Sequence, residues 1–390
     1  MAFGVYVHIP YCLQRCRYCD FTTFEQSEIR PPEDYLQLVL TEIRSRAKIF
    51  DSTELASLYF GGGTPSIVPA EHIVAIINEL ANVGFPLSSR SEVTIEINPA
   101  TVDVEKFRIY RDAGVNRFSV GAQTFDNGLL ALCGRRHNAQ DTHRTLDFLA
   151  HHGVNYSFDL LFALPNQSLE QLTFDLDIVQ QYDPPHLSAY CLTVPSGHPM
   201  AINRPSDDKQ IKMFALIQER LSTMGLLQYE ISNFSRPGRE SAHNLLYWSD
   251  QPYWGIGLSA HSYRPGLPYG QRFWNPNSME AYEAQAPLSY PPKKQFEILK
   301  AHEALTDYCH TSLRRSQGLL REGLNSRFGA QGLELVHRRL QSPSVSELIV
   351  PGPDGWTLSK QGVHLSNRVF LETTFSEEDF PHSGRIKEDF

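Results

Sequence analysis

Two hydrophobic patterns alternate along the first two thirds of the chain. Short apolar runs rich in β-branched and aromatic residues are each followed by a longer segment whose apolar residues recur every three or four positions. The first pattern is typical of buried strands and the second of amphipathic helices. The predicted strands are residues 5–9, 58–60, 93–97, 117–120, 156–161 and 187–191. The predicted helices are residues 32–50, 70–81, 104–113, 141–151, 169–180 and 207–224.

Six alternations of strand and helix predict an α/β fold with parallel strands. Parallel strands joined by right-handed crossovers form a closed or partial β/α barrel. A doubly wound open sheet is the alternative, because periodicity alone does not separate the two. In a barrel, the residues just beyond the C-terminal ends of the strands share one mouth, where active sites lie. We therefore expect the functional residues at these positions.

The pattern changes after residue 232, and we predict three regions: 1–232, 233–290 and 291–390. Glycines and aromatic residues crowd positions 234–269, which predicts loops over a pocket. In the last region, helical patterns at 295–305 and 319–327 precede two short apolar runs at 348–350 and 356–358. A Pro-Gly-Pro-Asp-Gly turn joins these runs, and a final helix is expected from Ser359. Helices followed by a hairpin and another helix predict a small α+β domain similar to a winged helix.

Composition and charge exclude several classes of protein. The 390 residues carry a net charge of −9, and residues 291–390 hold 13 basic and 13 acidic side chains. We therefore expect no nucleic-acid partner, since such partners require a basic surface. No apolar run approaches the ~18 residues that span a bilayer. The first residues lack the charged region and cleavage site of a signal peptide, which predicts a cytoplasmic protein.

Three of the six cysteines, Cys12, Cys16 and Cys19, lie within eight positions just after the first predicted strand. In a reducing compartment such a cluster predicts a metal site. A zinc site needs a fourth ligand, for which His8 or Asp20 is available. An iron–sulfur cluster bound by three thiolates would leave one iron open to an outside ligand. The other cysteines, Cys133, Cys191 and Cys309, are expected to be small buried apolar residues.

The segment YVHIPYCLQRCRYCDF at residues 6–21 strongly resembles the opening of the radical S-adenosylmethionine (SAM) superfamily, in its oxygen-independent coproporphyrinogen III oxidase-like group. The resemblance continues in order along the chain and thins over the last hundred residues. Its further motifs are GGGTPS at 61–66, EINP at 96–99, GAQTF at 121–125, GRRH at 134–137, residues 159–165, YEISNF at 229–234 and HNLLYW at 243–248.

This resemblance implies a partial (β/α)6 barrel of the TIM type that holds a [4Fe–4S] cluster and SAM at its mouth. The cluster would be bound by the three clustered cysteines, and an electron from it would split SAM into a 5′-deoxyadenosyl radical. The implied contacts of SAM are the glycine turn, an ammonium partner, a carboxylate clamp, ribose partners and a residue near the cluster. Gly62, Gly63 and Thr64 would form the glycine turn, Glu96 would bind the ammonium group and Arg135 the carboxylate. Gln123 and Asp159 would bind the ribose, and Tyr6 would lie near the cluster.

The resemblance leaves two functions open, a coproporphyrinogen III oxidase and a haem chaperone. The oxidase type carries a further cysteine two positions after the third ligand, where this chain has Phe21, and an extension before the cluster strand, where five residues precede Tyr6. The HNxxYW signature at 243–248 matches the haem-chaperone branch, which we favour.

In that branch His243 would ligate the haem iron, and Leu245, Leu246, Tyr247 and Trp248 would cover the ring. The alternative for His243 is a core histidine. The implied partners are haem, haem-acceptor proteins and an electron donor for the cluster, and a transient membrane association stays open.

Overall fold

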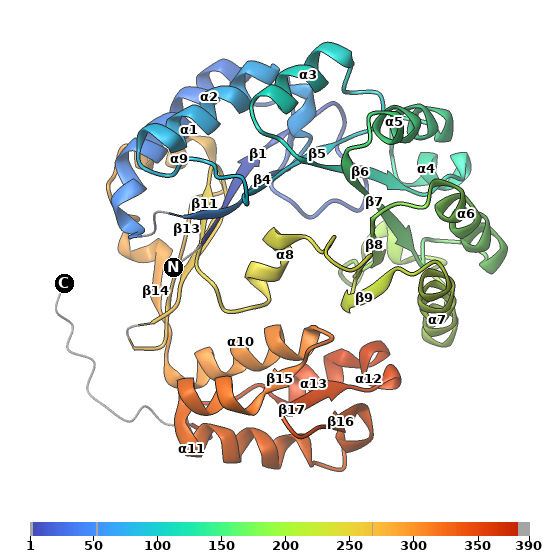
Figure 1. Cartoon of the computed structure of the whole chain (residues 1–390), viewed down its shortest axis with the longest axis vertical. Coiled ribbons are helices and arrows are strands. Elements are labelled where there is room, and N and C mark those ends of the chain that lie inside the picture. Colours follow the sequence, from blue (N-terminus) through green and yellow to red (C-terminus); the bar gives the residue numbers. More distant parts are fainter. Residues whose placement is uncertain (1–2, 52–53, 267, 381–390) are drawn as a thin grey trace.

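The computed structural model describes residues 3–51, 54–266 and 268–380. In these residues twelve strands form one mixed sheet that curves around a central space (Figure 1). Its six central strands are parallel and follow one another in sequence order, each pairing with the next. They are β1 (Phe3–Ile9), β4 (Leu55–Gly62), β5 (Glu92–Ile97), β6 (Arg117–Gln123), β7 (Asn155–Phe162) and β8 (His186–Cys191).

Helices connect these strands on the outer side of the sheet (Figure 1). Local signals fix their starts: Asn138 and Ser168 each form a capping box, in which the side chain accepts from a free backbone N–H of the first turn. The helices are α1 (Pro32–Arg46), α2 (Ala70–Asn82), α3 (Val104–Asp112), α4 (Asn127–Leu132), α5 (Ala139–His151), α6 (Leu169–Tyr182) and α7 (Asp207–Thr223).

The predicted partial (β/α)6 barrel is therefore confirmed. All six predicted strands and all six predicted helices are present, with ends that shift by a few residues. The strand order runs from β1 to β8 without reversal, and the helices lie on one side. A doubly wound sheet reverses its order at a switch point and carries helices on both faces, so that alternative is excluded.

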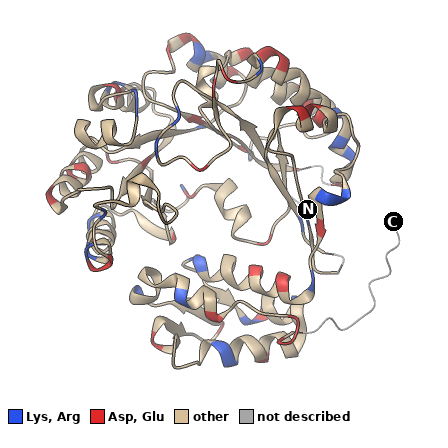
Figure 2. Cartoon of the chain, turned by 180° about the vertical axis from the view of Figure 1, so that it is seen from behind, with Lys and Arg blue, Asp and Glu red and all other residues tan. Residues whose placement is uncertain are grey.

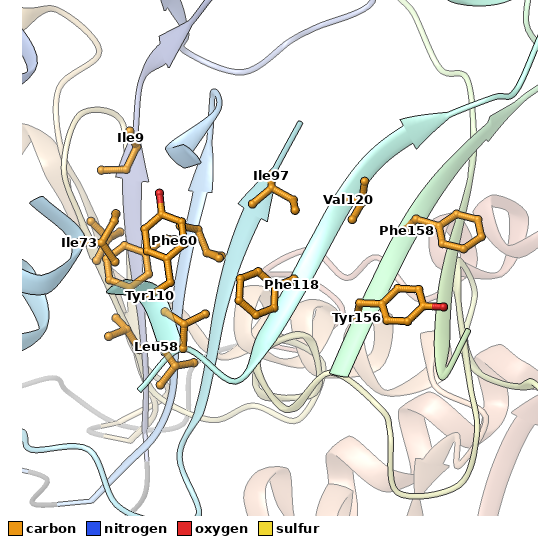
Figure 3. Close-up of a cluster of buried hydrophobic side chains, with 14 of the residues drawn as sticks. Ile9, Leu58, Phe60, Ile73, Ile97, Tyr110, Phe118, Val120, Tyr156 and Phe158 are labelled. Atoms are coloured by element: carbon orange, nitrogen blue, oxygen red, sulfur yellow. The ribbon is translucent and has the colours of Figure 1, made fainter. Parts of the chain in front are cut away.

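The main hydrophobic core lies between the sheet and the outer helices (Figure 3). Phe60, Phe118 and Phe158 project from β4, β6 and β7 and are fully buried, and Ile73 and Tyr110 lie against this face of the sheet from α2 and α3. Each such side chain contributes about 1.5–3 kcal/mol on burial. This core holds the strand ends, and thus the site residues on them, in fixed positions.

The expectation that 234–269 consists of loops is wrong, because strands and a helix lie within it. The longer region 227–298 extends the sheet at both edges. The antiparallel strands β9 (Leu227–Glu230) and β10 (Asn233–Ser235) follow β8. At the opposite edge β11 (Tyr253–Ile256) pairs in parallel with β1, although more than 240 residues separate them in the chain. Three antiparallel strands continue from it: β12 (His261–Arg264), β13 (Gln271–Trp274) and β14 (Phe296–Ile298). Two helices, α8 (Ala242–Tyr247) and α9 (Met279–Gln285), belong to the same region.

A buried ionic network joins these added strands to α1. Arg46 and Glu42 are 1% and 0% exposed and lie one helical turn apart, with Arg46 Nη1 2.9 Å from Glu42 Oε1. Glu42 also accepts hydrogen bonds from the backbone N–H of Gly257, the amide of Asn275 and the hydroxyl of Tyr282. A buried charge requires such partners, so this network fixes the β11–β12 connection to the barrel.

The last region forms a separate core from Leu299 onward. The predicted hairpin is confirmed as β16 (Ile349–Pro351) and β17 (Gly355–Leu358), and the predicted helix at Ser359 is α12 (Lys360–His364), which Ser359 caps. The helix predicted at 295–305 is wrong in its start, since residues 296–298 are taken into β14. The remaining elements are α10 (Ala301–Arg314), β15 (Leu319–Leu320), α11 (Arg321–Leu340) and α13 (Ser366–Glu372).

The last region lies across the open side of the barrel (Figure 1) and contacts the segment that follows α8. Arg314 of α10 stacks over the Trp248 ring at 4.4 Å and donates to Glu230 at 2.5 Å, and Arg327 of α11 pairs with Asp250. Basic and acidic residues are interspersed on the outer helices and on the last region (Figure 2). The division of the chain after residues 232 and 290 stays a prediction.

Candidate functional site

A cavity of about 410 Å³ lies at the C-terminal ends of the parallel strands, where the barrel rule predicts the site. We call it the cysteine cavity. Three groups of residues line it: the cysteine loop, the turn after β4, and the ends of β5 to β8. The residues used below are Cys12, Cys16, Cys19, Gly62, Gly63, Thr64, Glu96, Asn98, Gly121, Gln123, Arg135, Asp159, Tyr190 and Cys191.

The cysteine loop begins at a short strand, β2 (Tyr11–Cys12), which pairs in parallel with β3 (Phe24–Glu25). This pairing closes the loop at its base, so that the three thiols face the same space. Cys12 is buried, and burial raises the pKa of its thiol to about 11. The Cys16 sulfur accepts a hydrogen bond from Arg135 Nη1 at 3.3 Å, and the Cys19 sulfur lies 3.7 Å from Thr23 Oγ1.

The donor set fits an iron–sulfur cluster. Within the described ranges no group of three His, Cys, Asp or Glu side chains is already arranged to hold a metal ion. A cluster would therefore have to draw the three thiols together, which a loop closed only at its base permits. A thiol with a raised pKa becomes a thiolate when a metal displaces its proton. The loop length, the three sulfurs and the adjoining cavity are thus compatible with the cluster.

The glycines after β4 serve first to let three segments approach one another. A side chain at Gly62, whose φ is +112°, would place its Cβ 2.5 Å from the His8 ring, and one at Gly63 would lie 2.5 Å from the Tyr11 carbonyl oxygen. The N–H of Gly63 donates to Ile9 O, and that of Thr64 to Tyr11 O. The turn therefore holds the start of the cysteine loop, and its predicted contact with SAM stays a prediction.

Glu96, at the end of β5, is held by hydrogen bonds on both carboxylate oxygens. Tyr59 Oη donates to Oε1 at 2.8 Å, and the N–H of Gly62 donates to Oε2 at 3.1 Å. Burial raises the pKa of Glu96 to about 7, and the nearby carboxyl of Asp159 adds to the shift. Burial likewise raises the pKa of Asp159 to about 6. Two half-buried carboxyls thus face the cavity, where a bound cation would stabilise their ionised forms.

Arg135 lies between the cysteine loop and β6. Besides its bond to Cys16, its Nη2 donates to Asn98 Oδ1 at 2.7 Å and to the Gly121 carbonyl at 2.6 Å. The guanidinium is therefore fixed in the cavity wall, in contrast to the exposed Arg136. Gln123 lines the same wall with a positive φ of 69°. The predicted residues Gly62, Gly63, Thr64, Glu96, Gln123, Arg135 and Asp159 thus line one cavity with the three cysteines, and their individual roles stay predictions.

A second cavity of about 540 Å³ adjoins the first. We call it the aromatic cavity, because its lining is dominated by rings. The two cavities share Phe21, Tyr59, Gly62, Glu96, Tyr190 and Asn244. The remaining lining of the aromatic cavity is Tyr6, His8, Asp20, Thr22, His243, Tyr247, Tyr253, Ser259, Ala260 and His261.

The structure places Tyr6 in the aromatic cavity rather than in the lining of the cysteine cavity. It also gives His243 a fully buried position, 1% exposed. The His243 Nδ1 lies 2.8 Å from Ser57 Oγ and its Nε2 lies 2.9 Å from Tyr247 Oη. Burial lowers the pKa of His243 to about 3, so the ring is neutral. Both ring nitrogens are engaged, and iron ligation by His243 stays a prediction.

The signature at 243–248 does not present all its apolar residues to the aromatic cavity. Tyr247 lines it, whereas Leu246 packs against β1, where a Cβ on Gly4 would lie 2.6 Å from its side chain. Trp248 points to the last region, under Arg314. Leu246 and Trp248 therefore do not line the aromatic cavity, and contact of the 245–248 segment with haem stays a prediction.

One prediction about the other cysteines is also wrong. Cys133 and Cys309 are fully buried, as expected. Cys191 is exposed at the end of β8 and lines the cysteine cavity, where its sulfur lies 3.5 Å from Gln210 Oε1. The apolar sequence around Cys191 reflects the buried start of β8 and not its last residues, which emerge at the mouth.

Sequence reasoning missed most of the aromatic cavity. Tyr59 and Tyr190 alternate with core residues on β4 and β8, and Tyr253 and His261 come from strands that were expected to be loops. The strand-end rule gave no signal for Tyr253 and His261. Alternation along β4 could have identified Tyr59, because Leu58 and Phe60 face the core.

Comparison with known proteins agrees with this architecture. Residues 6–177 match the Radical SAM superfamily. The chain is 35% identical over 385 residues to the heme chaperone HemW of Haemophilus influenzae, covering 96% of this chain and 98% of that protein. It is 30% identical over 386 residues to the HemW of Lactococcus lactis, covering 97% and 98%. The solved coproporphyrinogen III oxidase HemN of Escherichia coli, a radical SAM enzyme, superposes with a TM-score of 0.79 at 20% identity, over 95% of this chain and 90% of that chain.

The fold and the superfamily match define the chain as a radical SAM protein. This class implies a [4Fe–4S] cluster and SAM as cofactors. Within the class, similarity over almost the full length of both proteins shows that the chain belongs to the HemW family. None of the helices in the described part of the chain is long and apolar enough to cross a bilayer.

Proposed function

We propose that this protein is a haem chaperone, which binds haem in the aromatic cavity and delivers it to acceptor proteins. The relatives that match it over nearly their whole length are named as heme chaperones. The observation that carries the proposal is an aromatic cavity beside the cysteine cavity, with a common wall. Its volume of about 540 Å³ lies within the roughly 300–1,000 Å³ typical of ligand sites.

Cys12, Cys16 and Cys19 would hold a [4Fe–4S] cluster in this proposal, and SAM would occupy the cysteine cavity against its open iron. When bound, the cluster supplies an electron at the barrel mouth. Arg135 donates a hydrogen bond to the Cys16 sulfur and thereby orients this ligand. Such bonds to cluster sulfurs also set the reduction potential.

The rest of the cysteine cavity would bind the parts of SAM by charge and hydrogen bonding. Glu96 and Asp159 offer carboxylates to its cationic groups, and Gln123 and Asp159 offer acceptors to the ribose hydroxyls. Gly62, Gly63 and Thr64 form the adjoining wall, and Arg135 would face its carboxylate. The arrangement places SAM against the wall that both cavities share.

The aromatic cavity supplies what a haem macrocycle needs, namely flat apolar surface with few charges. Tyr59 stacks on both Tyr6 and the His243 ring, with centroids 6.1 Å and 5.0 Å apart. Phe21, 64% exposed, belongs to both linings at the rim. An apolar side chain at this position, where the oxidase type carries a cysteine, favours the chaperone over a coproporphyrinogen III oxidase.

Two assays on the cluster-loaded protein test the proposal. Anaerobic titration with haem, followed in the Soret band, should show saturable binding of about one haem per chain. Incubation with coproporphyrinogen III, SAM and an electron donor should leave the porphyrinogen unchanged, whereas haem-loaded protein should transfer haem to an apo-haemoprotein. Formation of protoporphyrinogen, or the absence of saturable haem binding, would reject the chaperone function.

A further inference from the structure

The aromatic cavity contains three histidines, His8, His243 and His261, and they differ in whether a ring nitrogen is free. A haem iron is bound by the lone pair of a neutral imidazole nitrogen. A histidine whose two nitrogens already have partners must give one up before it can bind iron. The hydrogen bonds of the three rings therefore bear directly on which of them can serve as an iron ligand.

His8 and His243 are both fully engaged. His8 Nδ1 lies 3.0 Å from Tyr6 Oη, and His8 Nε2 lies 2.9 Å from the Thr22 carbonyl oxygen. The His8 residue is 4% exposed. His243 is bonded to Ser57 and Tyr247 in the same way. Ligation by either ring would leave a hydroxyl or a carbonyl in a buried place without its hydrogen-bond partner, which is unfavourable.

His261 has the opposite character. It is the first residue of β12, its side chain is exposed, and its ring makes no hydrogen bond to any other residue of the described chain. The ring stacks on Trp274 of β13 with a centroid distance of 5.9 Å and an interplanar angle of 22°, which fixes its plane. Desolvation at the cavity wall and the nearby Arg272 lower the pKa of His261, which favours the neutral ring.

The backbone of His261 is also closely positioned. It faces Gly255 of β11, where an added Cβ would lie only 2.1 Å from the His261 carbonyl oxygen. Gly255 and Ser262 are further joined, since the Gly255 N–H donates to Ser262 Oγ at 2.9 Å. The glycine thus allows β12 to approach β11 and sets His261 at the edge of the cavity.

From these contacts we propose that His261 ligates the iron of haem bound in the aromatic cavity, while His243 and Tyr247 form part of the wall against which the ring packs. This inference rests on the proposed function, because it takes haem as the cargo of that cavity. It assigns the iron ligand to a residue outside the 243–248 signature, on a strand that pairs with β11.

The test is a titration of four proteins with ferric haem: wild type, His261→Ala, His243→Ala and His151→Ala. His151 is an exposed residue of α5, so His151→Ala is the surface control. We expect His261→Ala to shift the Soret band and to weaken binding at least about tenfold, because even residues that only support a metal ligand account for roughly 10–100-fold in affinity. Added imidazole should restore the wild-type spectrum of His261→Ala. The spectrum of His243→Ala should keep its wild-type position.

Gly255→Ala provides a second, independent variant. It retains both histidines but should displace His261, and we therefore expect it to shift the Soret band like His261→Ala. Circular dichroism checks that each variant is folded. Saturable haem binding by the wild type with an unchanged spectrum in His261→Ala would overturn the assignment of His261 and leave the proposed function intact. Absence of haem binding by the wild type would overturn both.

Discussion

The two adjoining cavities differ in how they are built. The cysteine cavity lies at the ends of consecutive parallel strands, and most of its lining consists of hydrogen-bonding, charged or sulfur-containing side chains and glycines. The aromatic cavity lies between β1, β4 and the strands added beside β1, and tyrosines and histidines dominate it. The first is suited to a charged cofactor and a metal cluster, and the second to a flat apolar ligand. A barrel thus gains a second site when new strands join its open edge.

Residues of the common wall connect the two cavities physically. Tyr59 contributes its ring to the aromatic cavity, where it stacks on His243 at 5.0 Å, and its hydroxyl to Glu96 at 2.8 Å. Glu96 in turn faces both cavities. A ligand that changes the charge of Glu96 on one side therefore alters the hydrogen bonding of a ring on the other. This contact is a physical route by which SAM could influence haem binding.

The largest effect is expected from a substitution that removes the cluster and leaves the aromatic cavity in place. Cys16→Ala should lower the iron content of anaerobically reconstituted protein from about four per chain to near zero, because a cubane cannot be held by two thiolates. Iron and sulfide analysis provides the measurement. Cys309→Ala, in the core of the last region, is the matched control and should retain full iron content. One tightly bound zinc without sulfide in the wild type would contradict the prediction.

The next largest effect is expected from a substitution in the buried ionic network that joins the added strands to α1. Arg46→Ala should lower the free energy of unfolding by about 3–5 kcal/mol, because it leaves the buried Glu42 carboxylate without its cation. Arg44→Ala, two residues away, breaks an exposed pair with Glu79 and should cost only about 0–1 kcal/mol. Urea unfolding compares the two variants.

Glu42 holds the N–H of Gly257, close to Ser259 and Ala260 of the aromatic cavity. We therefore expect folded Arg46→Ala to lose more haem affinity than SAM affinity. Equal losses would show that the two cavities are not separately supported.

The same contrast explains what could be predicted from sequence. The barrel strands and the three cysteines were predictable, because alternation and strand-end position are local signals. The aromatic cavity was not, because β11 pairs with β1 across more than 240 residues, and its four residues (253–256) are too few to show a periodicity. The direction of Trp248 depended on Arg314, a residue of another region. His261 carries no motif, and its place in the cavity lining and its stacking on Trp274 arise from the pairing of β11, β12 and β13.

A smaller effect is expected in the cysteine cavity at Arg135. Arg135→Ala should weaken SAM binding by roughly 10- to 150-fold, since a hydrogen bond to a charged group contributes ~1.5–3 kcal/mol. Arg136→Ala is the control, because this neighbouring side chain is exposed. Calorimetry on cluster-loaded protein measures both, and iron analysis verifies that loss of the bond to Cys16 has not removed the cluster. Equal affinities of the two variants would show that Arg135 does not bind the SAM carboxylate.

The smallest expected effect is a pH dependence that arises in the common wall. Burial raises the pKa of Glu96 to about 7, so the carboxyl is largely protonated below neutrality. A cationic ligand favours the ionised carboxylate, and SAM binding below pH 7 must therefore release a proton. The affinity for SAM should fall by up to about tenfold per pH unit as the pH drops below 7, and should be nearly constant above pH 8.

Asp159, whose pKa burial raises to about 6, should steepen the fall at lower pH. Calorimetry from about pH 5 to about pH 9 gives the profile, and Glu96→Gln supplies the control, since it keeps the shape of the side chain but cannot ionise. This variant should bind SAM more weakly at pH 8, and its profile should lose the step near pH 7 and retain only the fall attributed to Asp159. A wild-type affinity that does not change across this range would show that Glu96 does not face the cationic group of SAM.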